Sequence, residues 1–183
     1  MSTYIINTEP EASSAADADE MLIFDATVNR TRKLGLDNLH AYTGGGVVNI
    51  GDNTSYTALA ANSGKTHFIP DLTGDLTISL PTAAANLRYE FVYAGVAADA
   101  QDWAIDTGSN TNYYLGGVAH LDTDAGSAGD EVVPVAGDGN SNSILNVLVP
   151  DVGTRVLAVC DGTNWVLSGQ VVGATAPTFA DQL

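Results

Sequence analysis

The chain has 183 residues, with 22 Asp and Glu against 6 Lys and Arg, and its formal charge of −16 excludes nucleic acid and anionic lipid as expected partners. Only 15% of the residues are charged, 19 are glycine, and most polar residues are Thr, Ser, Asn or Asp, so we predict an all-β fold. Cys160 is the only cysteine, which rules out an intrachain disulfide, and no run approaches the ~20 apolar residues of a membrane span.

The first 46 residues are expected to form an arm that carries a β-hairpin. Residues 1–20 combine one short apolar piece with an Ala, Ser, Asp and Glu stretch that buries little surface by itself. This stretch lacks a basic start followed by a continuous apolar run, so we expect no secretory signal. Residues 21–39, MLIFDATVNRTRKLGLDNL, predict an apolar strand, a turn and a basic strand that holds half of the positive charge of the chain.

A body is expected to span residues 47–183. Three consecutive glycines at 44–46 predict the boundary, because the interior of an element would not accept their backbone entropy. Short apolar runs then recur every ~8–15 residues with turn residues between them, which is typical of a β-sandwich, here jelly-roll-like, or of a barrel. The expected strands are 47–50, 57–60, 66–69, 76–80, 87–93, 103–105, 113–115, 132–135, 144–149, 155–160 and 165–168.

The stretch 56–93 carries the strongest strand signals. In 76–80, Leu and Ile alternate with Thr and Ser, as in a strand with one face in a core. In 87–93, Leu, Phe and two Tyr residues share one face, while Arg88 and Glu90 fall on the other. These two strands are expected to anchor the core of the body.

The clearest expected hairpin pairs strand 155–160 with strand 165–168. The loop between them reads Asp-Gly-Thr-Asn, which favours a tight turn. Residues 95–101 and 120–130 are interpreted as long acidic loops, and residues 169–183 as an extended strand with a frayed end.

Several motifs resemble ligand sites and are rejected on spacing. Residues 62–66, Asn-Ser-Gly-Lys-Thr, end like a phosphate-binding loop, but Leu59 stands where the first glycine belongs and a strand follows instead of a helix. The acidic runs 122–126 and 138–142 place oxygens at alternate positions as calcium loops do. Both lack the required glycine and the bidentate glutamate, so we interpret them as Asx turns.

No metal, cofactor or catalytic centre is expected. The histidines His40, His67 and His120 are far apart in the sequence, and Cys160 alternates with apolar residues like a buried hydrophobe. A GxSxG motif is absent from the sequence, and the chain is predicted not to be an enzyme. A carboxylate glycosidase stays open as a third hypothesis, with Asp102 as the residue to inspect beside Trp103, which is expected in the core.

Two phrases carry a resemblance to a known class of proteins. Residues 19–25 and 29–39, DEMLIFD and NRTRKLGLDNL, resemble a hairpin phrase near the N-termini of bacteriophage virion proteins and fibres. Residues 73–95, with DWAI at 102–105 and DGTNWV at 161–166, are similar to the β-sandwich modules of phage capsid decoration proteins and fibre heads. The usual glycine before the aromatic strand is Asn86 here. The resemblance implies a homotrimer located on the virion and assembled in the host cytoplasm.

The first hypothesis is therefore a non-enzymatic capsid decoration, or cement, protein. Such a protein needs an arm that reaches across neighbouring subunits and a rigid β-body that sits between them. Its partner would be the major capsid protein or another virion protein, and the arm would stabilise the shell. The expected capsid or inter-subunit contacts are the apolar Tyr4, Ile5, Ile6, Leu22, Ile23 and Phe24 and the basic Arg30, Arg32 and Lys33.

The alternative hypothesis is a fibre or adhesin module that binds a host glycan or receptor. The loop 108–117 is rich in Gly, Asn and Tyr. Tyr113 and Tyr114 in this loop are candidates for stacking on a sugar ring.

Overall fold

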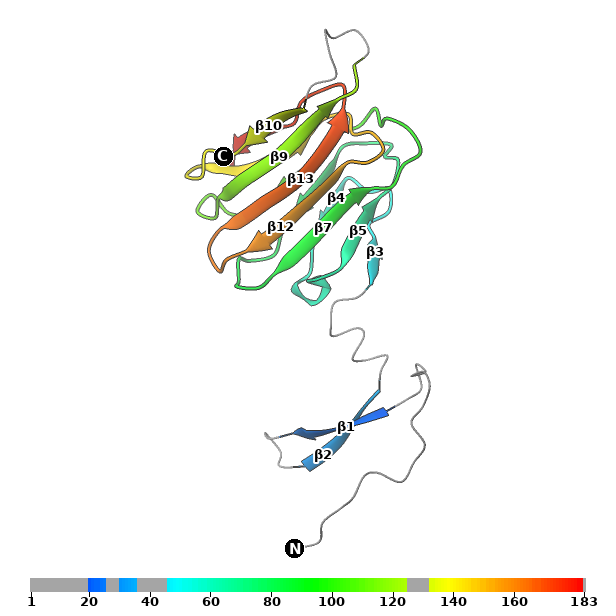
Figure 1. Ribbon diagram of the computed structural model, residues 1–183, viewed down its shortest axis with the longest axis vertical. Helices are drawn as coiled ribbons and strands as arrows, with labels where there is room; N and C mark the ends of the chain where they lie inside the picture. The colour runs from blue at the N-terminus through cyan, green and yellow to red at the C-terminus, as the bar shows by residue number, and fades with distance from the viewer. Residues whose placement is uncertain (1–19, 26–29, 36–45, 125–131, 183) are drawn as a thin grey trace, which may run out of the picture. The chain divides into compact units, whose positions relative to one another are not determined.

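The structure, a computed structural model, describes residues 20–25, 30–35, 46–124 and 132–182 (Figure 1). The chain divides into two compact units, Met1–Gly45 and Gly46–Leu183, and the division falls within the glycine run. In the first unit, β1 (Glu20–Asp25) pairs antiparallel with β2 (Arg30–Gly35). The second unit is referred to below as the body.

The body consists of two packed β-sheets. The large sheet has seven strands in the order β10-β9-β13-β12-β7-β5-β3, and the small sheet has five in the order β14-β11-β8-β6-β4. Neither sheet closes on itself, so the predicted sandwich is confirmed and the barrel is wrong. The strands are β3 (Val47–Asn49), β4 (Ser55–Thr57), β5 (Thr66–Ile69), β6 (Leu76–Ser79), β7 (Arg88–Tyr93), β8 (Trp103–Asp106), β9 (Tyr114–Asp122), β10 (Val132–Ala136), β11 (Asn142–Val147), β12 (Arg155–Cys160), β13 (Trp165–Gly173) and β14 (Thr178–Asp181).

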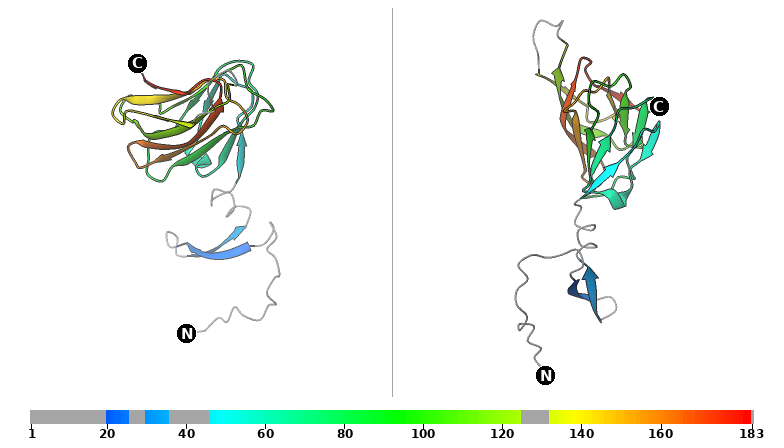
Figure 2. Two further views of the ribbon diagram at one scale, coloured as in Figure 1. Left: turned by 45° about the horizontal axis from the view of Figure 1, so that its top comes forward. Right: turned by 90° about the vertical axis from the view of Figure 1, so that its right-hand side faces the viewer.

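The first six strands of the body wind as a two-sheet coil. β3, β5 and β7 pair in parallel in the large sheet, while β4, β6 and β8 pair in parallel in the small sheet. The chain therefore crosses to the other layer after each strand, and Figure 2 shows the two layers from the side. A jelly roll is antiparallel, so this part differs from the jelly-roll-like prediction. A strand with one buried face alternates apolar and polar residues whether its neighbours are parallel or antiparallel. The sequence therefore did not distinguish this parallel coil from a jelly roll.

The remaining strands are mainly antiparallel. β12 pairs antiparallel with β7 and with β13, which confirms the predicted hairpin. At its turn, Asp161 accepts hydrogen bonds on Oδ1 from the amides of Thr163 (2.8 Å) and Asn164 (2.7 Å). These amides hold the pKa of the Asp161 carboxyl below its ordinary value. β13 then lies parallel to β9, and β10 forms the outer edge.

The core lies between the two sheets and is rich in aromatic residues. Its largest fully buried side chains include Trp103, Trp165, Tyr89, Tyr114 and Phe91. The predicted inward alternation of 76–80 and 87–93 is confirmed, as are the core position of Trp103 and the burial of Cys160. Full burial of one such aromatic side chain removes roughly 150–250 Å² from water, so these rings dominate the packing energy.

The structure differs from the prediction at the strand 57–60 and at the loop 120–130. β4 begins two residues earlier than predicted and a 3-10 turn, Ala60–Asn62, follows it. His120 lies inside β9 and not in a loop, and its Nε2 lies 2.9 Å from the carbonyl oxygen of Gly173. The acidic run 120–130 predicts a loop, but β9 extends to Asp122. A Cβ at Gly117 would lie 2.1 Å from the Val135 oxygen, so this glycine allows β10 to approach β9 closely.

Candidate functional site

The predicted contact residues of the arm are only partly within the described residues. Tyr4, Ile5 and Ile6 lie outside them. The structure places Leu22, Ile23 and Phe24 on β1, and the basic Arg30, Arg32 and Lys33 on β2. In the register of the hairpin, Ile23 is opposite Arg32 and Leu22 is opposite Lys33. The apolar and the basic predicted contacts are therefore brought together in one hairpin.

The predicted sugar-stacking pair does not form. Tyr114 is fully buried, its ring packs against Phe179 and its hydroxyl donates to the carbonyl of Ile105 at 2.9 Å. The prediction is wrong for Tyr114, because the residue is the first inward-facing position of β9. Tyr113 is half-buried, and its amide donates to Asn164 Oδ1.

Asp102, the residue singled out for glycosidase chemistry, lines a hollow of about 240 Å³ together with Asp75. Both carboxylates hold the backbone: Asp75 Oδ1 accepts from the Asp102 amide at 3.0 Å, and Asp102 Oδ1 accepts from the Val149 amide at 2.9 Å. These bonds tie the ends of β6, β8 and β11 together, which is a structural task.

The motifs that resemble ligand loops also have structural roles in the backbone. Asp138 Oδ1 accepts from the amides of Asn140, Ser141 and Asn142 at 2.9–3.0 Å, as an Asx turn does. Residues 62–66 lead from the 3-10 turn directly into β5. Within the described ranges, no three His, Cys, Asp or Glu side chains are grouped as a metal site, and no helix is long and apolar enough to cross a membrane.

The outward side of the large sheet is the most unusual surface of the body; we call it the large-sheet face. No other strand of the body covers it, and Figure 1 looks onto it with the small sheet behind. Val166 is 43% exposed and Val132 is 69% exposed on this face. Its apolar members are Phe68, Val92, Leu115, Ala119, Leu121, Val132, Pro134, Leu157, Val159, Val166 and Val172. Those on β5, β7, β9, β12 and β13 alternate with buried residues along their strands, whereas β10 has no buried residue.

These apolar residues are neighbours across the strands. Val159 is opposite Val166, which is opposite Leu115, so one apolar row spans β12, β13 and β9. Directly opposite residues on one side of a sheet have Cβ atoms about 4.5–5.5 Å apart and pack against each other. A second row joins Val172, Leu121 and Val132. Together the rows make the face apolar across β12, β13, β9 and β10, and Arg88 of β7 lies opposite Val159 at the end of the first row.

A polar network sits among these rows. Glu90 on β7 accepts from Thr66 Oγ1 at 2.7 Å and from Arg155 Nε at 2.6 Å, and a second Arg155 nitrogen forms an ion pair with it. Burial alone would raise the pKa of Glu90, but the hydrogen bonds from Thr66 and Arg155 and the charges of Arg155 and Arg88 outweigh it, so the pKa lies below its ordinary value. The network joins β5, β7 and β12.

Replacing this carboxylate should flatten the acid limb of the stability curve. The folded pKa of Glu90 is depressed, so its stabilisation is complete above the unfolded value of about 4.5 and is lost as the pH falls through the folded pKa. For Glu90→Gln we expect a loss of about 1 kcal/mol or less near neutral pH, because Arg155 is 61% exposed and screened by solvent. Urea unfolding at several pH values measures this, and identical acid limbs in both proteins would contradict it.

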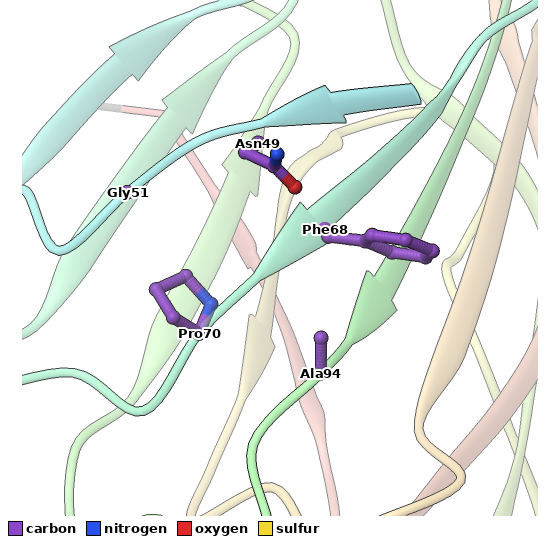
Figure 3. A pocket seen from close by; sticks show the side chains of 5 residues that line it. All are labelled: Asn49, Gly51, Phe68, Pro70 and Ala94. Carbon is purple, nitrogen blue, oxygen red and sulfur yellow. The ribbon is translucent and has the colours of Figure 1, made fainter. Parts of the chain in front are cut away.

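Two shallow hollows lie at opposite edges of the large-sheet face. One, of about 200 Å³, is lined by Asn49, Gly51, Phe68, Pro70 and Ala94, beside the edge strand β3 (Figure 3). The other, of about 350 Å³, lies along β9 and β10 and is lined by residues 116–119, 132 and 134–136. Both are predominantly apolar.

Sequence reasoning missed this face, although a signal for it was present. In 155–160, Val, Leu, Ala, Val and Cys follow one another without a polar residue, so both sides of the strand are apolar. A strand with one wet face alternates, whereas a strand covered on both faces reads as a continuous apolar run. Alternation alone assigns only one side of this run, that of Cys160, to the core.

Comparison with known proteins adds no relative. No protein-family model matches the chain, and no curated protein matches its sequence significantly. Its function is therefore argued from the residues and their arrangement.

Proposed function

We propose that the chain is a non-enzymatic structural protein of a bacteriophage particle, a capsid decoration or cement protein that binds the shell through its N-terminal unit. The major capsid protein or another virion protein would be its partner, and the decorating form would be a homotrimer. The site of action would be the virion, after assembly in the host cytoplasm.

The observation that supports this proposal most is the two-unit layout. A short hairpin with apolar and basic strands forms one unit, and a rigid sandwich forms the other. On a chain with a charge of −16, three of the six cations, Arg30, Arg32 and Lys33, lie on β2. A basic strand of this kind is suited to an acidic surface of a neighbouring subunit, where charge complementarity gives specificity and a faster association.

The resemblance of residues 19–39 and 73–95 to phage virion proteins supports the same proposal. The second phrase coincides with β6 and β7, which lie in the small and the large sheet respectively and whose apolar residues form the centre of the core. The resemblance of this segment therefore concerns the framework of the sandwich and not a reactive centre.

The composition of the particle tests the proposal. Particles of the phage that encodes the chain would be purified on a density gradient, and their proteins identified by mass spectrometry. We expect the chain in intact particles, and gold-labelled antibodies against it on the shell. Absence of the chain from purified particles, or labelling confined to the tail tip, would overturn the decoration role; tail labelling would favour the fibre alternative.

A further inference from the structure

The two outer faces of the sandwich differ in chemistry although they belong to one fold. On the small sheet, the outward positions follow the usual rule and are mainly polar: Ser55, Thr57, Thr77, Ser79, Ala104, Asp106, Ile144 and Asn146. On the large sheet, most outward positions are aliphatic. Mixed and antiparallel sheets with one solvated side normally alternate apolar and polar residues. The large-sheet face therefore has the composition of a sheet side that is buried against another surface.

The large-sheet face is also electrically balanced on a strongly acidic body. The seven strands carry two cations, Arg88 and Arg155, and two carboxylates, Glu90 and Asp122. Outside these strands, the described part of the body holds eleven carboxylates and a single cation, Lys65. Two molecules with a charge of −16 repel each other in most orientations, because juxtaposed like charges at an interface are unfavourable. The large-sheet face is where that repulsion is smallest.

Its extent suits a protein interface. Seven strands spaced ~4.8 Å apart, with a mean length of about six residues at ~3.3 Å each, cover roughly 650 Å² before side-chain relief is added. A stable complex buries about 800 Å² per partner, so this face supplies the larger part of one interface. The two apolar hollows at its edges, beside β3 and along β9 and β10, offer seats for protruding side chains.

We propose that the large-sheet face is the surface through which copies of this chain associate, each copy burying its aliphatic rows against another. The occupant is a second copy, because its own large-sheet face is equally apolar and equally balanced in charge, so contact between the two faces brings no excess of like charge together. Val166, at the centre of one row, and Val132, at the β10 edge, are the expected anchors. This face would be the subunit interface of the proposed homotrimer. Self-association through it does not depend on whether the chain decorates a virion.

Sedimentation equilibrium of the full chain tests the inference without any particle, so its failure is distinguishable from failure of the virion role. The chain has a mass of 18.9 kDa, and we expect the wild type to sediment as a multiple of it. Val166→Asp should raise the dissociation constant at least about tenfold, as loss of a buried anchor does. Val132→Asp, at a 69% exposed position that tolerates change, serves as a second variant.

Val96→Asp is the matched control, since this valine is 89% exposed in the loop after β7, outside the strands of the large sheet. It should assemble like the wild type. Thermal unfolding of each variant would confirm that it is folded. A monomeric wild type, including one whose own hairpin covers the face, would overturn the inference. So would folded Val166→Asp and Val132→Asp proteins that assemble as tightly as the control.

Discussion

Replacing Gly169 with alanine should destabilise the body by at least about 3 kcal/mol, more than most single substitutions do. Gly169 has a φ of +144°, a backbone conformation that residues with a Cβ rarely adopt, at a typical cost of about 1–3 kcal/mol. A Cβ there would also lie 2.2 Å from the Arg155 carbonyl oxygen on the paired strand β12. The substitution would have to push β12 and β13 apart at the middle of the large sheet.

Gly74→Ala is the control for this experiment. A Cβ at Gly74 would meet only the Thr54 methyl group, at the ordinary contact distance of 3.5 Å. We expect a change within about 0.5 kcal/mol for this variant. Urea unfolding of the two proteins measures the difference. Equal stabilities would contradict the described pairing of β12 with β13.

Replacing His67 with leucine should remove an acid sensitivity of the body and leave it at least as stable at neutral pH. His67 is fully buried among the rings of Tyr56, Tyr89 and Phe91, with centroids 5.2–5.9 Å away, and neither ring nitrogen has a hydrogen-bond partner among the described residues. A buried polar group without a partner is destabilising, and leucine has a similar volume without that cost.

The sign of the pH effect follows from the pKa. Burial lowers the pKa of His67 below its ordinary 6.5, while nearby carbonyls of Lys65 and Glu90 oppose this and the Lys65 charge adds to it. The unfolded chain therefore binds the proton more readily. Stability falls as the pH drops below about 6.5, by at most about 1.4 kcal/mol per pH unit, until the folded pKa is reached. His67→Leu should be flatter across this window.

His120→Leu provides the matched comparison. His120 is also buried, at 4% exposure, but its Nε2 lies 2.9 Å from the Gly173 carbonyl oxygen, which would keep only the longer hydrogen bond (3.3 Å) from the Thr123 amide. We expect this variant to lose about 1–3 kcal/mol near neutral pH, unlike His67→Leu. Thermal unfolding between about pH 5 and pH 8 compares all three proteins. Wild-type and His67→Leu curves of the same shape would contradict the role assigned to His67.

Local patterns predicted the elements of this fold better than their partners. Strands 66–69 and 155–160 have the predicted bounds, because apolar runs there end at turn residues. The parallel coil of β3 to β8 was not predictable in the same way, since alternation shows which side of a strand is buried but not the direction of its neighbour. The extension of β9 over His120 was not predicted, because the acidic run 120–130 is typical of a loop and the two glycines before it, needed for close approach of the neighbouring strands, are typical of loops as well.

For the candidate sites too, local residue patterns were predictable, whereas the arrangement of the strands around them was not. The hairpin residues were predicted from charge and hydrophobicity, and the structure adds their backbone register. Tyr114 was assigned to a loop surface, but its position as the first inward residue of β9 places it in the core. The large-sheet face depends on the side-by-side arrangement of β9, β13, β12 and β7, which are far apart in the sequence. A single strand gives only a hint of such a surface.

Co-sedimentation with phage particles stripped of the chain would show whether the N-terminal unit binds the shell as proposed. The full chain would be compared with a chain that starts at Val47, and with a full chain in which Arg30, Arg32 and Lys33 are all replaced by glutamate. We expect the full chain to sediment with the particles and truncation to abolish this, because the proposed apolar and basic contacts lie in residues 1–46. The triple replacement should weaken binding, most strongly at low salt. Undiminished binding by the folded truncated chain would contradict the account.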